Sequence, residues 1–261
     1  MKVNKIVCAA LVVAAGYSAF AAEESIASAN VVGYTTASLD ANKWYLMGCD
    51  FRAVGGTSFS IQDMVINLTP GTDLYDSPNI QYWDGAQLKT LVYIDGAWDE
   101  DAADGDGDFV VAWADDDGNA SKMVADPGFG CWIKLPEAGS IQCAGEVVEL
   151  NTYPCVFGTQ WSLVGNPYPV SLSFNGGSLD CSSITPGTDL YDSANIQYWD
   201  GTQLKTLIYI DGAWDEDAAG GEGDFVVAWT DDDGNATKLT LPPCSGFWIK
   251  GAEAGSFNFV K

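Results

Sequence analysis

Residues 79–98 read NIQYWDGAQLKTLVYIDGAW, and residues 195–214 repeat this stretch with two changes, at positions 86/202 and 92/208. Apolar and polar residues alternate on both sides of Asp84-Gly85, a pattern typical of two strands joined by a tight hairpin turn. A second Asp-Gly pair, Asp95-Gly96, predicts a further turn before Ala97 and Trp98. The stretch therefore predicts antiparallel β-structure.

The repeat extends well beyond the hairpin. Residues 69–122 recur at residues 185–238, at an offset of 116, with only seven changes in 54 positions. Weaker matches on both sides predict one module at 30–145 and a second at 146–261, each of domain size. Many short strands separated by turns indicate an all-β fold, with two tandem copies of an antiparallel β-sandwich or barrel. Only residues 60–65 and 178–183 are predicted to form short helical turns.

The N-terminal region has the features of an export signal. Lys2 and Lys5 precede an apolar run at residues 6–20, and Ala19-Phe20-Ala21 offers small residues for cleavage. We expect a signal peptide at 1–21 and a short leader at 22–29. The run is shorter than a bilayer span, so no transmembrane segment is expected in the mature chain. The expected location is the cell surface or the exterior, with the periplasm as an alternative.

The chain is strongly acidic. Loss of Lys2 and Lys5 with the signal would leave nine basic residues against 36 acidic ones, a formal charge of −27. Such a surface repels nucleic acid and attracts cations. Hydrophobic residues make up 47% of the chain, which is enough to bury a core and argues against disorder.

The chain contains no histidine. This absence excludes Ser-His-Asp and Cys-His catalysis and histidine-ligated zinc. Carboxylate chemistry and metals held by oxygen ligands are still allowed.

Six cysteines follow the signal region, at positions 49, 131, 143, 155, 181 and 244. In an exported chain they suggest up to three disulfides, with fifteen possible pairings. The alternative is that they serve as small buried hydrophobes. Cys131 and Cys143 stand where the second copy has Phe247 and Phe259, so we expect both positions to lie in the core.

Several short motifs resemble tandem secreted modules that are abundant in some environmental bacteria. They are Asn-Val-Val-Gly-Tyr at 30–34, Trp-Ser-Leu-Val-Gly-Asn-Pro-Tyr-Pro at 161–169, the Pro-Gly-Thr-x-Leu-Tyr segments, the mid-module Gly-x-Trp, and Gly-Phe-Trp-Ile at 246–249. The first copy departs from the pattern, with Cys-Asp-Phe-Arg at 49–52 in place of Asn-Pro-Tyr-Pro. That family has no assigned activity, so the resemblance implies export and fold only.

Acidic loops are the first candidate site. Clustered carboxylates on a glycine-rich loop suit a hard cation, and calcium is the one we would expect. The candidate ligands are Asp99, Glu100, Asp101, Asp106 and Asp108 in the first copy, and Asp215, Glu216, Asp217, Glu222 and Asp224 in the second. The spacing does not match an EF-hand, because Phe109 stands where that loop needs glycine. A solvated, self-repelling loop is the alternative.

Aromatic residues beside turns are the second candidate site. A tryptophan ring can stack on a sugar ring while a nearby carboxylate binds its hydroxyls. The candidates are Trp83, Asp84 and Trp98, with Trp199, Asp200 and Trp214 as their equivalents. The alternative is that most tryptophans are packed in the core.

These features suggest three functions. A non-catalytic surface or matrix component fits best, with cell-surface or matrix partners and possible self-association. A carbohydrate-binding protein, assisted by calcium, is the second, with polysaccharide as its partner. A carboxylate-based glycoside hydrolase is the third, and no isolated apolar-flanked Glu supports it.

Overall fold

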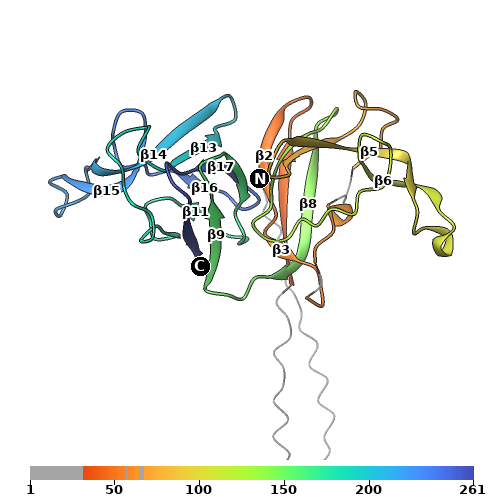
Figure 1. Cartoon of the computed structure of the whole chain (residues 1–261), viewed down its shortest axis with the longest axis horizontal. Coiled ribbons are helices and arrows are strands. Elements are labelled where there is room, and N and C mark those ends of the chain that lie inside the picture. The colour runs from red at the N-terminus through yellow and green to blue at the C-terminus, as the bar shows by residue number, and fades with distance from the viewer. Residues whose placement is uncertain (1–31, 57, 65–67) are drawn as a thin grey trace, which may run out of the picture.

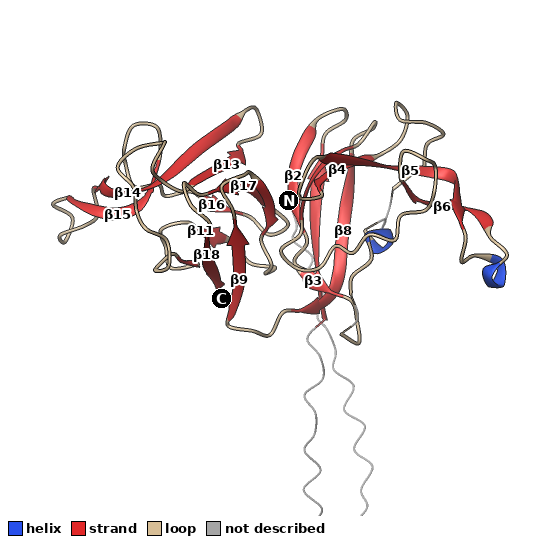
Figure 2. Cartoon of the chain, viewed as in Figure 1, coloured by secondary structure: helices blue, strands red, loops and turns tan. Residues whose placement is uncertain are grey.

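The computed structural model describes residues 32–56, 58–64 and 68–261. The predicted signal peptide and leader lie outside them. The chain is all-β, as predicted, and its strands form several antiparallel sheets (Figure 2). Two short 3₁₀ helices are present, η1 (Ile61–Asp63) and η2 (Ala103–Gly105). Within the described residues, no helix is both long enough and apolar enough to cross a membrane.

The first copy forms a sandwich of two sheets. The larger sheet has the order β2 (Trp44–Gly48), β7 (Gly130–Lys134), β4 (Asn79–Trp83), β5 (Leu88–Asp99) and β6 (Asp108–Ala114). The smaller sheet has the order β1 (Val32–Leu39), β8 (Gly139–Val147) and β3 (Phe51–Arg52). Inward side chains from both sheets, such as Phe51 and Ile80, form one buried core, in which Cys131 and Cys143 lie as predicted.

The second copy repeats the larger sheet, whereas the third strand of its smaller sheet comes from a different segment of the repeat. Its larger sheet has the order β10 (Ser162–Gly165), β17 (Gly246–Lys250), β13 (Asn195–Trp199), β14 (Leu204–Asp215) and β15 (Asp224–Thr230). Its smaller sheet has the order β12 (Leu179–Asp180), β18 (Gly255–Val260) and β9 (Thr152–Phe157), and β11 (Leu172–Ser173) pairs with β16 (Thr240–Leu241). The predicted boundary between residues 145 and 146 falls inside β8, which ends at Val147.

Two local predictions were wrong. Asp95-Gly96 is not a turn, because β5 continues through it to Asp99. The register shifts between Asp95 and Ala97, and Gly96 takes the positive φ of 104° that such a bulge favours. Residues 178–183 contain the short strand β12, not a helical turn, because pairing with β18 outweighs the local preference. The helical turn near residue 60 is confirmed as η1.

The two larger sheets meet where β2 and β7 of the first module approach β10 and β17 of the second. Met47 bridges Ser245, and the equivalent Val164 bridges Phe129. The Gly48 N–H donates to the Cys244 carbonyl at 2.8 Å, and the Gly165 N–H donates to the Gly128 carbonyl at 2.8 Å. Each contact has a counterpart with the modules exchanged, so the copies are related by a pseudo-two-fold axis.

Glycines make this close approach possible. A Cβ on Gly48 would lie 2.6 Å from the Gly165 Cα, and a Cβ on Gly165 would lie 2.6 Å from the Gly48 Cα. Gly246 is similarly close, with its Cβ position 2.6 Å from the Met47 carbonyl oxygen. Any larger residue at the two central positions would push the modules apart.

The disulfide prediction was wrong. All six cysteines in the described residues are free and buried, which agrees with the alternative that they pack as small hydrophobes. Burial raises the pKa of Cys131 and of Cys155 to about 12. Such thiols stay protonated and are poor nucleophiles.

Candidate functional site

Trp83 and Trp199 lie at the junction between the modules, where two pairs of tryptophan rings meet. Trp83 packs edge-on against Trp248 of the other module at 6.1 Å between ring centroids. By the same symmetry, Trp199 packs against Trp132 at 5.7 Å. Part of each hairpin-turn tryptophan ring is therefore used for module packing.

Asp84 and Asp200 stabilise their own hairpin turns. The Asp84 carboxylate accepts the backbone N–H groups of Ala86 and Gln87, each at 2.8 Å. Asp200 accepts the equivalent pair from Thr202 and Gln203. The bond from Gln203 leads the causes that lower the pKa of Asp200 to about 2. These carboxylates have local structural roles.

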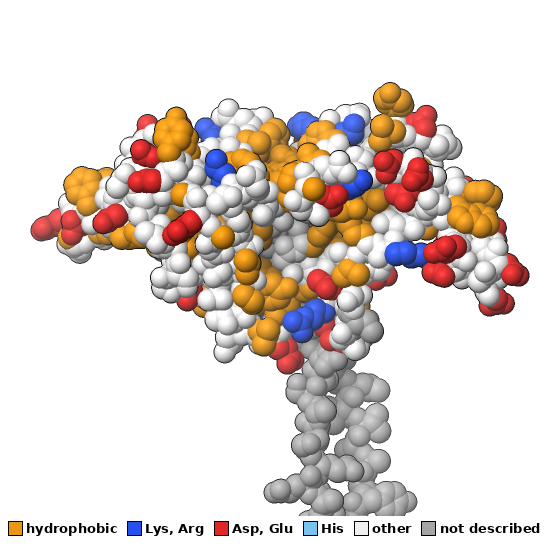
Figure 3. All heavy atoms as spheres, viewed as in Figure 1, with side chains coloured by type: hydrophobic (Ala, Val, Ile, Leu, Met, Phe, Trp, Pro, Cys, Tyr) orange, Lys and Arg blue, Asp and Glu red, His pale blue; other side chains and the backbone are white. Residues whose placement is uncertain are grey.

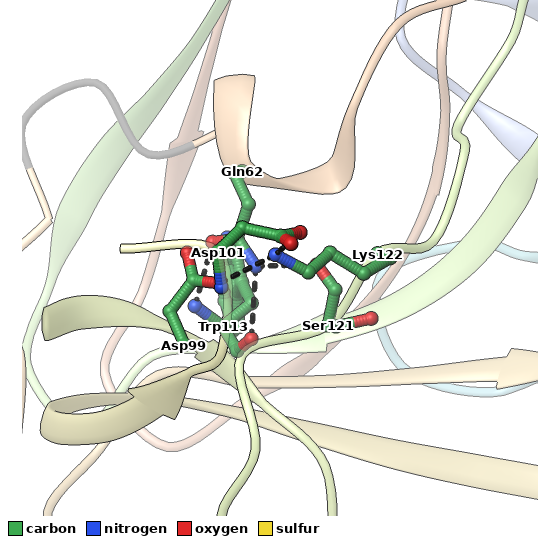
Figure 4. Close-up of polar contacts among 6 residues, drawn as sticks. All are labelled: Gln62, Asp99, Asp101, Trp113, Ser121 and Lys122. Atoms are coloured by element: carbon green, nitrogen blue, oxygen red, sulfur yellow. Dashed lines mark hydrogen bonds and ion pairs between the residues drawn. The ribbon is translucent and has the colours of Figure 1, made fainter. Parts of the chain in front are cut away.

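The acidic loops lie at the tips of the β5–β6 and β14–β15 hairpins. A lysine that follows each hairpin in the chain pairs with carboxylates of its loop. In the first copy Lys122 pairs with Asp99 and, at 2.9 Å, with Asp101 (Figure 4). In the second copy Lys238 pairs with Glu216 at 2.6 Å and with Asp217 at 2.7 Å. These bonds raise the pKa of Lys122 to about 12. Each lysine places its charge where a bound cation would be expected.

The predicted calcium ligands do not converge in the described structure. No group of three or more acidic or cysteine side chains lies close enough to hold a metal ion anywhere in residues 32–56, 58–64 or 68–261. The Asp108 carboxylate accepts the neighbouring Phe109 N–H, and Asp224 accepts that of Phe225. Glu100, Asp106 and Glu222 are exposed. Calcium binding stays a prediction that this geometry does not favour.

Trp98 and Trp214 belong to exposed apolar surfaces. Trp98 is 39% exposed and packs edge-on against Phe109, which is 68% exposed, at 5.2 Å. Val111, which is 47% exposed, lies on the same side of β6. We call Trp98, Phe109 and Val111 the hairpin face; its counterpart is Trp214, Phe225 and Val227. Phe109 and Val111 were missed by the sequence reasoning, although Phe-Val-Val beside an acidic loop breaks the alternation and was an available signal.

The hairpin face is exposed because the hairpin extends past the core. The β5–β6 hairpin extends outward past the rest of its module (Figure 1). Along β6, Trp113 is fully buried, whereas Val111 and Phe109 on the same side of the strand are exposed. The opposite side carries Ala97 and Ala112, which pack in a small cluster with Ala120. Gly118 and Ala120 bind the backbone of Trp98 there. One side of the hairpin is therefore covered and the other is open.

The outer edge of β6 is capped at one end only. The Gln62 side chain accepts the Trp113 N–H at 2.9 Å and donates to the carbonyls of Trp113 and Ser121 (Figure 4). Asn175 makes the same three bonds in the second copy, to Trp229 and Thr237. Neither residue stood out in the sequence, because the two differ in type and lie in dissimilar segments. Both caps stop short of Val111 and Val227.

A shallow groove of about 660 Å³ lies near the start of β5. Its walls combine apolar side chains such as Leu74 and Leu88 with polar ones such as Gln87, Asp115 and Asp116. It is large enough for one or two sugar rings, and it does not include Trp83 or Trp98.

Asp50 is the only fully buried carboxylate in the described residues, and it lies where the modules meet. It accepts a bond from the Thr35 hydroxyl at 3.3 Å and contacts the Cys244 thiol of the other module at 3.6 Å. Burial raises the pKa of Asp50 to about 6. Cys244 takes a φ of 59°, where the equivalent residue of the first copy is Gly128.

No known protein family, curated protein or solved structure matches this chain. The functional conclusions therefore depend on the geometry of the chain itself.

Proposed function

We propose that this chain is an exported, non-catalytic surface or matrix component that works by presenting two equivalent attachment surfaces. The observation that carries the proposal is the occurrence of the same hairpin face at both ends of the molecule. Figure 1 places β5–β6 and β14–β15 at opposite ends, and Figure 3 shows acidic and apolar side chains together there. Two equivalent surfaces favour cross-linking or multivalent attachment.

The exposure of the hairpin face supports a binding role. Aromatic and aliphatic side chains are costly to leave in water, and Phe109 and Phe225 are 68% and 67% exposed. Contiguous exposed apolar surface commonly marks an interaction site. The same side chains appear at both ends, so one type of partner would satisfy both.

Carbohydrate binding is the second candidate. The exposed rings of Trp98 and Trp214 beside tip carboxylates favour it, and the groove near Leu88 offers a further surface for a sugar. Stacking on these rings would not require the junction tryptophans.

The test compares self-association with glycan retention. The chain expressed from Ala22 is examined by light scattering, and separately by retention on a panel of polysaccharides in calcium and then in EDTA. Assembly without any glycan is the expected result for a surface or matrix component. Retention on a glycan by monomeric protein would replace the proposal with the second candidate. Loss of that retention in EDTA would assign calcium a role at the tips.

A further inference from the structure

We infer that the free edges of β6 and β15 pair with the same edges of a second copy of this chain, which extends both larger sheets across the contact. This inference rests on the proposed function, because it names the partner that the two hairpin faces take. It rests on the free hydrogen-bonding edges of β6 and β15, on the position of the apolar side chains, and on the contact that the opposite edges already make inside the chain.

The hydrogen-bonding groups of the edge are available. Because Trp113 directs its N–H and C=O away from β5 toward Gln62, the alternation of the strand directs those of Val111 and Phe109 the same way. Within the described chain, Val111 makes no hydrogen bond outside the β5–β6 ladder. The outward N–H of Phe109 is satisfied only by its neighbour Asp108. Open edges of this kind pair readily with another strand.

A single register uses these free groups and avoids the capped ones. In an antiparallel pair centred on Val110, Phe109 lies opposite Val111 of the second copy, and the two residues exchange both backbone bonds. By symmetry, Val111 lies opposite Phe109 of the second copy, and these two residues also exchange both backbone bonds. Trp113 takes no part, so the Gln62 cap stays in place. The equivalent register in the second module is centred on Val226.

The same register covers the hairpin face. Directly opposed residues of an antiparallel pair direct their side chains to the same side of the sheet. Phe109 would pack on Val111 of the second copy, and the reverse pair would form beside it. The edge-on contact between Trp98 and Phe109 would remain, with part of both rings removed from water.

Part of the opposite edge of each larger sheet is already occupied inside the chain. Met47 on β2 bridges Ser245 of the other module, and Val164 on β10 bridges Phe129. Within the described residues, Val111 on β6 and Val227 on β15 make no such bridge. Since each molecule has two such free edges, pairing would produce open-ended chains of molecules.

Electrostatic repulsion opposes this contact at low ionic strength. Asp95 and Asp108 lie beside the edge, and the protein carries a formal charge of −25. Added salt or a divalent cation screens such repulsion between exposed charges. Assembly should therefore strengthen with ionic strength, unlike an association held by opposite charges.

The experiment places lysine on both edges. The chain expressed from Ala22 is examined by sedimentation velocity in low and high salt, and so is the V111K/V227K variant. The matched control is L74K/L190K, which adds the same charge at exposed leucines away from the edge. We expect chains of molecules for the parent and the control in high salt, and monomers for V111K/V227K. V227K alone should stop at dimers, because only one edge per molecule stays free.

Two outcomes would overturn the inference, and they differ in what they leave standing. Assembly that persists in V111K/V227K would show that another surface is used, and the proposed function would survive. A parent chain that is monomeric at every salt concentration would remove self-association itself. V111P/V227P provides a second variant, because these residues direct their N–H outward and proline there spares the β5–β6 ladder.

Discussion

Asp50 has the most unusual environment of any carboxylate in the described structure. It is buried where the modules meet, and its side-chain partners are the Thr35 hydroxyl and the Cys244 thiol, neither of which carries a positive charge. Burial raises its pKa to about 6 because the charged form loses its hydration. The group therefore favours the folded state most when it is protonated.

We predict that D50N changes the pH dependence of stability. The folded-state pKa lies above the unfolded value of about 4, so the stabilising effect of Asp50 is complete below pH 4 and is lost as the pH rises through 6. This difference of about two in pKa corresponds to a free energy of about 3 kcal/mol at most. Relative to the parent, D50N should gain stability between pH 4 and pH 8. Urea unfolding across this range measures the gain, and a difference that does not change with pH would contradict the assigned pKa.

At the scale of elements, the hairpins β5–β6 and β14–β15 extend beyond their modules, and one amide side chain caps each outer strand. Gln62 and Asn175 differ by one methylene and come from dissimilar segments, yet each makes three bonds to its edge strand or the adjoining segment. The cap holds the inner half of the edge strand, while the outer half stays open. This division makes the end of the hairpin the free edge.

We predict that N175A destabilises the second module by about 2 kcal/mol, because buried backbone groups of Trp229 lose their partners. Urea unfolding measures the loss. N151A is the control. The Asn151 side chain is exposed in the link between the modules. The hydrogen bond that Asn151 accepts from the Lys261 N–H uses its backbone carbonyl, which the substitution keeps. Equal stability of N175A and N151A would contradict the capping role.

At the scale of the whole molecule, the arrangement of the modules depends on a close backbone approach. Gly48 and Gly165 bring β2 and β10 together, and the tryptophan pairs Trp83–Trp248 and Trp132–Trp199 flank the junction. This packing directs the two hairpin faces to opposite ends, which is the geometry that the proposed function needs.

We predict that G165A loosens the junction. Its Cβ would lie 2.3 Å from the Phe129 carbonyl oxygen and 2.6 Å from the Gly48 Cα, so the modules must separate, at a cost of about 1–3 kcal/mol. Thermal unfolding and small-angle scattering measure the loss of stability and any increase in size. G158A is the control, because its nearest neighbour would be 3.9 Å away. A G165A protein as stable and compact as G158A would rule out this role for the glycine pair.

Local patterns in the sequence determined the fold class. The alternation at 79–83 and the Asp84-Gly85 turn specify a hairpin through neighbouring residues alone, and the structure contains that hairpin. Phe247 and Phe259 marked Cys131 and Cys143 as core positions for the same reason, because a site that accepts either residue must be apolar. Gly96 was misassigned because the positive φ that favours glycine in a turn also favours it in a bulge.

Only the tertiary structure decided which surfaces are free. Trp83 and Trp98 both read as exposed aromatic candidates, yet one packs at the junction and the other remains on an open face. Lys122 pairs with Asp101 across 21 residues of chain, and the cysteines that suggested disulfides are free. Sequence periodicity shows which side of a strand is apolar. It cannot show what covers that side, because the covering group comes from distant parts of the chain.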